Sequence, residues 1–256
     1  MTDEQPVLTQ RRGRTSLITI NRPDQRNAIN AAVANGIATA LDELDADPGL
    51  SVGVLTGPGK GFCAGMDLKA CVAGERPHVG DRGFAGITRR SASKPLIAAV
   101  EGFAVAGGLE VALSCDLIVA ARGARLGIPE VKRSLVAAAG ALLRLPRALP
   151  RNVAMEMALT GEPIDAERAH ALGLVNRLAE PGHALDLALE LAEAIALNAP
   201  LALRATKRIL VESVDWPESE FFARQNELVA PVAASEDARE GATAFAQKRA
   251  PNWQGR

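Results

Sequence analysis

Short apolar segments alternate with helical patterns over the first two thirds of the chain, and this alternation restricts the fold more than any other feature. Four segments have the length and composition of strands: Thr15–Ile20, Val52–Thr56, Ile97–Val100 and Leu117–Ala121. Most of them lack polar positions, which is typical of parallel strands covered by helices on both faces. We therefore predict an α/β fold with largely parallel strands.

The clearest helical pattern separates the first two of these strands. Asn30 is a suitable N-cap for it, and Asp47-Pro48 ends it. The helix would bury one face, whose apolar residues recur at intervals of three to four: Ile29, Val33, Ile37, Leu41 and Leu44.

Beyond Asn152 helical patterns follow one another. We expect helices over Val153–Leu159, Ala166–Leu172, His183–Leu197 and Leu201–Val211, two more between Pro217 and Lys248, and a single strand at Leu174–Leu178. Several of these helices carry apolar stripes that a monomer would leave uncovered. We therefore divide the chain into a core, residues 1–195, and a C-terminal helical region, residues 196–256.

Composition excludes several classes of protein. Lys and Arg number 29 against 30 Asp and Glu, and aromatic residues make up 3%, so the chain lacks the positive field and the stacking platforms of a nucleic-acid-binding protein. Cys63, Cys71 and Cys115 form no C-x-x-C pair and are expected to be buried thiols in a reducing compartment.

No targeting or membrane-spanning segment is expected. Residues 1–14 contain no apolar run, and acidic residues interrupt the longest apolar stretch, Pro95–Val119. These features predict a soluble cytoplasmic protein. The Gly- and Arg-rich segment Cys71–Arg90 is expected to be a mobile loop.

Two glycine-rich segments are candidates for ligand binding. The segment Thr56–Gly61 lacks the first Gly and the Ser or Thr of a phosphate-binding loop, and Gly102–Gly108 lacks the spacing of a dinucleotide-binding motif. Glycine instead lets backbone N–H groups approach a ligand closely. Gly107 would open a helix and present a free donor to developing negative charge, and Phe62–Leu68 would supply a second donor. The alternative is that both segments are only tight turns.

Two carboxylates lie close to these segments in the sequence. Glu110 falls in the first turn of the helix opened by Gly107-Gly108, and Glu130 follows Ile128-Pro129. Burial would raise the pKa of either group and suit it to acid–base chemistry. Alternatively, Glu110 interacts with the helix dipole, and Glu130 is a solvated charge balanced by Lys132 or Arg133.

Other catalytic chemistries find no support in the sequence. The three histidines have no metal-ligand spacing, so no metal site is expected, and no G-x-S-x-G motif of a serine hydrolase occurs.

Ordered sequence blocks along nearly the whole chain resemble those of the crotonase family, also called the enoyl-CoA hydratase/isomerase superfamily. They are Asn21-Arg22-Pro23 with Arg26-Asn27-Ala28, Val54–Gly57 through Phe62–Leu68, Lys94-Pro95 with Ile97–Val100, Gly107-Gly108 with Glu110, Cys115-Asp116, Pro129-Glu130-Val131, Arg144-Leu145-Pro146, and Leu159-Thr160-Gly161 with Gly173–Asn176. The resemblance implies a core built as a spiral of ββα units, and a C-terminal helical region that forms homotrimers or hexamers.

The resemblance also implies an acyl-coenzyme A thioester as the ligand. The backbone N–H groups of Met66 and Gly107 would hold its carbonyl oxygen, and each donor would lower the barrier to enolate formation by about 3 kcal/mol. Phe245 and Lys248 would close the site. The other implied substrate-binding residues are Arg26, Ala28, Ala64, Gly65, Asp67, Leu68, Gly108 and Pro129.

The resemblance further implies an enoyl-CoA hydratase. Glu110 and Glu130 match the two carboxylates that hold one water, with Glu130 as general acid and base and Glu110 orienting the water that adds to C3. No cofactor is implied, since coenzyme A is part of the substrate. Ala106 and Ser134 depart from the usual glycines, and the stretch from Pro129–Arg133 through Leu145–Arg147 also resembles carnitinyl-CoA dehydratases. A carnitinyl-CoA dehydratase-like or isomerase activity, or a non-catalytic acyl-CoA-binding protein, therefore stays open.

Overall fold

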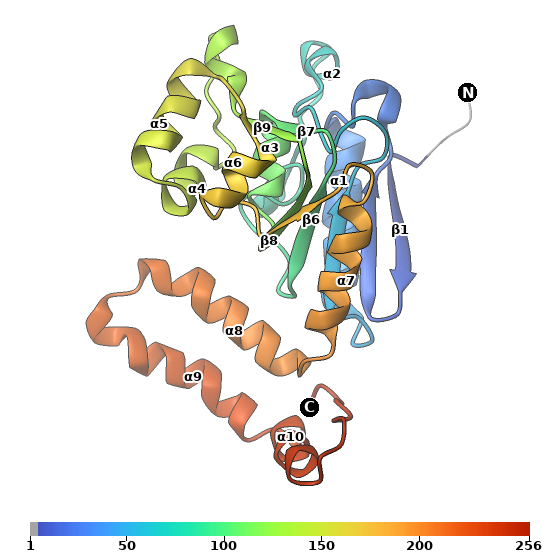
Figure 1. The fold of residues 1–256 in the computed structure, drawn as a ribbon, viewed down its shortest axis with the longest axis vertical. Helices are drawn as coiled ribbons and strands as arrows, with labels where there is room; N and C mark the ends of the chain where they lie inside the picture. Colours follow the sequence, from blue (N-terminus) through green and yellow to red (C-terminus); the bar gives the residue numbers. More distant parts are fainter. Residues whose placement is uncertain (1–4) are drawn as a thin grey trace.

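A six-stranded sheet forms the centre of the computed structural model, which describes residues 5–256 (Figure 1). All neighbouring strands are parallel except the first pair, which is antiparallel. In spatial order the strands are β1 (Val7–Arg12), β2 (Thr15–Ile20), β3 (Val52–Thr56), β6 (Leu96–Val100), β8 (Leu117–Ala121) and β11 (Arg177–Ala179).

Two smaller sheets lie beside the central one. In the three-stranded sheet, β9 (Arg125–Gly127) pairs parallel with β7 (Phe103–Val105) and antiparallel with β10 (Ile164–Asp165). A short hairpin pairs β4 (His78–Val79) with β5 (Gly83–Phe84).

Helices cover both faces of the central sheet. Helix α1 (Ala31–Ala46) contacts β1, β2 and β3, and α7 (Ala184–Ala196) contacts the sheet from β2 to β11. Alternate strand residues therefore join different cores: Leu55 packs with the side chains of α1, whereas Val54 packs with those of α7. The predicted α/β fold with mostly parallel strands is confirmed.

The remaining helices are mostly short, and those after β9 form two groups. The short ones are η1 (Pro23–Gln25), α2 (Leu68–Val72), η2 (Gly80–Arg82), α3 (Gly107–Ala112) and η3 (Pro129–Arg133). Near the core lie α4 (Ala141–Ala148), α5 (Arg151–Thr160) and α6 (Ala166–Ala171). Extending away from it are α8 (Pro200–Glu212), η4 (Ser213–Asp215), η5 (Glu218–Glu220), α9 (Phe221–Ala233) and α10 (Glu236–Ala246).

A partly exposed ion pair attaches α8 to the sheet. Lys207 Nζ lies 2.6 Å from the Asp116 carboxylate and donates to the Lys94 carbonyl oxygen at 2.9 Å. Large apolar side chains nevertheless stay exposed on α8 and α9, among them Leu210 and Phe222. Among residues 5–256, no helix combines the length and the apolar character that crossing a membrane requires.

Most of the elements expected from the sequence are present. The bounds of β2, β3 and β8 are those expected, and the Asn30 side chain accepts a hydrogen bond from the Val33 N–H as the N-cap of α1. The strand expected at Leu174–Leu178 begins later, at Arg177, because Leu174 and Val175 first turn back and donate to the Ala169 carbonyl oxygen at the end of α6.

The structure corrects two expectations. The segment Cys71–Arg90, expected to be a mobile loop, contains the end of α2, the β4–β5 hairpin and η2, and its Arg82 is only 2% exposed, since it pairs with Asp42 and donates to the Arg90 carbonyl oxygen. Of the three free cysteines expected to be buried, Cys63 is buried, Cys115 is a partly exposed residue whose thiol is nevertheless buried, and Cys71 is partly exposed.

Replacing Lys94 by Met is expected to destabilise the protein. Lys94 is 4% exposed, and its Nζ donates to the carbonyl oxygens of Leu44 and Asp47, at 2.7 and 2.6 Å, at the C-terminal end of α1. Leaving those carbonyls unpaired costs about 1–3 kcal/mol in free energy of unfolding, measurable by urea denaturation. The exposed Lys60→Met is the control, and equal stability of the two variants would contradict this role for Lys94.

Candidate active site

The two glycine-rich segments lie against each other at the centre of the site. The Cys63–Ala104 bridge joins the loop after β3 to β7, and the Val105 N–H donates to the Cys63 carbonyl oxygen at 3.1 Å. A Cβ built on Gly108 would lie 2.1 Å from that oxygen, and one built on Gly65 would lie 2.9 Å from the Gly107 nitrogen. Only glycine allows the two backbones to approach this closely.

The backbone N–H groups of Met66 and Gly107, one from each segment, donate to no acceptor among residues 5–256. Met66 pairs with Ile29 in a parallel bridge whose bonds use the Gly65 carbonyl and the Asp67 N–H, so the Met66 N–H points away from Ile29. Gly107 is the first residue of α3, where N–H groups have no partner within the helix. These are the two N–H groups that the resemblance names as donors to a thioester carbonyl oxygen, a role that stays a prediction.

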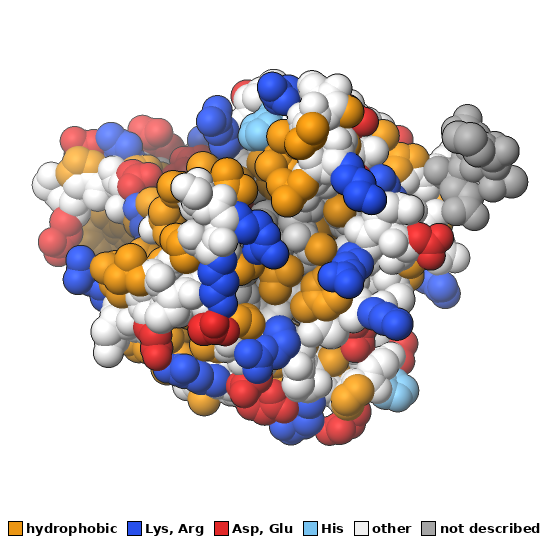
Figure 2. Space-filling model, turned by 90° about the horizontal axis from the view of Figure 1, so that it is seen from above, with side chains coloured by type: hydrophobic (Ala, Val, Ile, Leu, Met, Phe, Trp, Pro, Cys, Tyr) orange, Lys and Arg blue, Asp and Glu red, His pale blue; other side chains and the backbone are white. Residues whose placement is uncertain are grey.

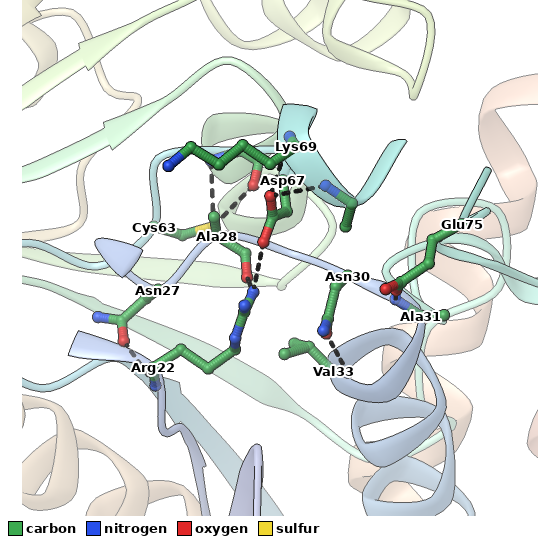
Figure 3. Close-up of polar contacts among 12 residues, drawn as sticks. Arg22, Asn27, Ala28, Asn30, Ala31, Val33, Cys63, Asp67, Lys69 and Glu75 are labelled. Atoms are coloured by element: carbon green, nitrogen blue, oxygen red, sulfur yellow. Dashed lines mark hydrogen bonds and ion pairs between the residues drawn. The ribbon is translucent and has the colours of Figure 1, made fainter. Parts of the chain in front are cut away.

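The turn before α1 is tied to the Met66 loop by polar contacts (Figure 3). Arg22 pairs with the Asp67 carboxylate at 3.0 Å and donates to the Ala28 carbonyl oxygen at 2.7 Å. Asp67 also caps α2 by accepting from the N–H groups of Lys69 and Ala70. Burial tends to raise the pKa of Asp67, but these N–H groups and Arg22 together lower it.

Asn27 fastens the same turn to the end of β3 and the loop that follows it. Its amide donates to the carbonyl oxygens of Pro58 and Gly61 at 2.9 and 2.8 Å. The Ala64 N–H donates to the Arg26 carbonyl oxygen at 3.1 Å. The structure therefore brings together five of the substrate-binding residues implied by the resemblance: Arg26, Ala28, Ala64, Asp67 and Leu68.

Glu110 is buried and held by backbone N–H groups. It is 4% exposed, and its Oε1 accepts from Ala139 at 2.7 Å and from Ala141 at 3.1 Å. Burial raises the pKa of Glu110, while these two N–H groups and the positive charge of Arg144 oppose the rise. The carboxylate is therefore fixed by the turn before α4 and not by the dipole of its own helix alone.

Glu130 has a different environment. It lies in η3 after Pro129, and its Oε2 is buried without a hydrogen-bond partner in the described chain. Burial raises its pKa and the nearby charge of Glu110 adds to the rise, whereas its own backbone N–H and Arg133 oppose it. Of the two cations expected to balance Glu130, Lys132 pairs with Glu162 instead, whereas the charge of Arg133 acts on Glu130.

Two residues expected to close the site do not approach it within one chain. Phe245 is 87% exposed on α10, and Lys248 follows it; Figure 1 shows α10 at the opposite end of the molecule from α2. The cause is the long α8–α9 pair, which carries α10 away from the core.

Across residues 5–256 no cluster of three or more His, Cys, Asp or Glu is arranged to hold a metal ion.

Three polar residues that support the site were not singled out as functional from the sequence: Arg22, Asn27 and Arg144. Each lies within a sequence block that carried the resemblance, which was the signal available. Each of them makes a contact that spans between 31 and 56 residues of sequence, so these distant partners appear only in the folded chain.

The glycine loops meet, the N–H groups of Met66 and Gly107 have no acceptor among residues 5–256, and the charges of Glu110 and Glu130 interact. On this sheet, these features define an enzyme of the crotonase superfamily. The chain belongs to the enoyl-CoA hydratase/isomerase family, whose model matches residues 11–256.

Individual relatives agree over nearly the full length. The enoyl-CoA hydratase EchA19 of Mycobacterium tuberculosis is 43% identical, over 98% of this chain and 97% of that protein. The carnitinyl-CoA dehydratase of Salmonella typhi is 42% identical, over 93% of this chain and 94% of that protein. The crystal structure of the enoyl-CoA hydratase EchA1 from Mycobacterium marinum superposes with a TM-score of 0.97 at 59% identity, over 99% and 100% of the two chains.

Replacing Gly108 by Ala is expected to force the two loops apart. Its backbone is helical, so the added Cβ brings no strain of its own, but it would collide with the Cys63 carbonyl oxygen. We expect a loss of about 1–3 kcal/mol in stability by denaturant titration. Gly241→Ala in α10 is the matched control, since the nearest atom to its Cβ is 3.2 Å away on the Trp253 ring. A stable Gly108→Ala variant would mean that the loops have room to separate.

Proposed function

We propose that this protein is an enoyl-CoA hydratase, a hydro-lyase that adds water reversibly across the 2,3 double bond of an enoyl-CoA to give a 3-hydroxyacyl-CoA. The observation that carries the proposal is the pairing of Glu110, held by two N–H groups, with Glu130, whose buried Oε2 has no partner in the described chain. The family membership and the relatives named as hydratases support it.

The N–H groups of Met66 and Gly107 would bind the thioester carbonyl oxygen. When water attacks C3, the electrons of the double bond move onto that oxygen and form an enolate. Two donors that are already oriented in a dry site stabilise this charge without reorganisation, by about 3 kcal/mol each. Gly65 and Gly108 would serve by letting the two loops meet, and Pro129 by starting the turn that carries Glu130.

The two carboxylates would divide the proton transfers. Glu110 would accept a hydrogen bond from the attacking water and orient its oxygen toward C3, while Glu130 would give a proton to C2. The proton released by the water returns to the carboxylate pair, so the enzyme ends in its starting state. Glu130 suits the acid role, because both burial and the Glu110 charge favour its protonated form.

The coenzyme A moiety would bind beside the turn of Arg26 and Ala28 and the loop of Ala64, Asp67 and Leu68. Asp67 would act there mainly by holding Arg22 and capping α2, since both of its oxygens are engaged. Exposed cations suited to the phosphates lie on these same segments, notably Arg26, Lys60 and Lys69. Figure 2 shows several Lys and Arg side chains around hydrophobic ones on the face seen from above.

Further features of the enzyme are proposals of the same kind. The exposed apolar side chains of α8 and α9 support a homotrimer or a hexamer built through residues 196–256. The reaction as written needs no metal or redox cofactor, because the coenzyme A arrives with the substrate. The cytoplasmic location stays a prediction from the sequence.

A second candidate function is dehydration of a specialised acyl-CoA such as a carnitinyl-CoA. The relative named as a carnitinyl-CoA dehydratase, 42% identical, favours it. The same two carboxylates would serve, because dehydration is hydration in reverse. A panel of plain and functionalised 2-enoyl-CoA substrates distinguishes the two candidates by their relative kcat/KM.

Loss of the enoyl-thioester absorbance of crotonyl-CoA and of a longer 2-enoyl-CoA tests the proposal. Wild-type protein is expected to turn over at least one of them, and Glu110→Gln and Glu130→Gln are expected to lower kcat by about 10²–10⁴-fold. The exposed Glu193→Gln is the control and should match wild type. Thermal stabilisation by acyl-CoA without any turnover would indicate a non-catalytic binding protein instead.

A further inference from the structure

Arg144 of α4 lies directly against the turn that holds Glu110. A Cβ built on Gly140 would lie 2.0 Å from Arg144 Nη1, so the guanidinium packs onto the Gly140 backbone. Its Nη2 donates to the Thr88 carbonyl oxygen at 2.6 Å, and its Nη1 lies 3.5 Å from the Ala139 carbonyl oxygen. Arg144 thus connects two segments far apart in sequence.

The Ala139 residue links Arg144 to the carboxylate. Its N–H donates to Glu110 Oε1 at 2.7 Å, while its carbonyl oxygen faces Arg144. Gly140, at φ 113°, adopts a conformation that suits glycine and leaves room for the guanidinium. A displacement of Arg144 would therefore move the turn and, with it, the two N–H groups that fix Glu110.

Glu110 is the negatively charged group that acts on Arg144. The groups that act on the guanidinium are Glu110, Cys115 and Arg147. Burial raises the pKa of the Cys115 thiol, which stays neutral, and Arg147 carries the same charge as Arg144. Glu110 is therefore the anion among them, and its other charged neighbour is the Glu130 carboxyl.

We propose that Arg144 is a positioning residue of the hydration site, which fixes the Ala139–Ala141 turn and keeps Glu110 in its carboxylate form. The inference rests on the proposed function. Two carboxyl groups whose charges interact in a site shielded from water do not both ionise readily. A fixed positive charge near one of them therefore decides which of the two holds the proton. Arg144 places it on Glu130, the proposed acid, and leaves Glu110 free to accept from water.

The test compares wild type with Arg144→Gln and Arg144→Lys. Removing the charge should raise the pKa of Glu110, so the acidic limb of the kcat profile for an enoyl-CoA should move to higher pH by about one unit, and kcat at neutral pH should fall by about 100-fold. Arg144→Lys keeps the positive charge but loses the planar guanidinium group. The acidic limb of its kcat profile should therefore stay near that of wild type, while its kcat should be lower than that of wild type. The KM should change little.

Arg147→Gln is the matched control. It removes a charge of the same kind from the same helix, where Arg147 is exposed and lies 3.8 Å from Asp215, and it should leave the profile unchanged. A lower kcat in Arg144→Gln with an unmoved acidic limb would overturn the proposal, because a merely structural role predicts that result. If thermal unfolding shows that Arg144→Gln is not folded, Arg144→Lys alone tests the proposal. A shift of its acidic limb by a full pH unit from that of wild type would then overturn the proposal.

An infrared titration of the carboxyl stretch separates this proposal from the proposed function. The Glu110 band, assigned by its loss in Glu110→Gln, should titrate at higher pH in Arg144→Gln than in wild type, whether or not the protein turns over an enoyl-CoA. If wild type shows no turnover but the Glu110 band still titrates at higher pH in Arg144→Gln, only the hydratase assignment is contradicted. Turnover without the displacement would overturn the role of Arg144.

Discussion

The contact between Gly108 and the Cys63 carbonyl oxygen sets the distance between the two loops on which the site is built. One loop follows β3 and the other joins β7 to α3, and each contributes a backbone N–H without a protein acceptor in the described chain. Any side chain at Gly108 would occupy the position of that carbonyl oxygen. The placement of Met66 and Gly107, the start of α3 and the position of Glu110 all depend on this approach.

The carboxyl groups of Glu110 and Glu130 lie in environments that stabilise a negative charge to different extents. Glu110 is buried and Glu130 is partly buried, and burial raises the pKa of each. Glu110 has two N–H donors and the field of Arg144 to offset that effect, whereas Glu130 has a buried oxygen without a partner and faces the Glu110 charge. This asymmetry gives two glutamates different electrostatic environments, and it arises from the backbone and the neighbouring charges, not from residue type.

Local patterns predicted the elements whose causes are local. Asn30 caps α1 because its side chain reaches the Val33 N–H three residues on, and the apolar run Val52–Thr56 forms a buried strand. Strand β1 was not predicted, since Val7–Arg12 is mostly exposed at the edge of the sheet and carries two arginines. The β4–β5 hairpin was missed because its short strands depend on Arg82, whose partner Asp42 lies in α1.

By itself the sequence determined the α/β class and most strands and helices. Ordered blocks that resemble a known family also pointed to Met66, Gly107, Glu110 and Glu130 as candidate site residues. Only the tertiary structure decided that Glu110 is held by Ala139 and Ala141, that Glu130 keeps a free buried oxygen, and that α10 lies far from α2 in one chain. The physical reason is the sequence separation over which each interaction acts. Helix caps and apolar periodicity involve residues a few positions apart, whereas the burial of a side chain, its charged neighbours and its backbone donors depend on segments tens of residues away.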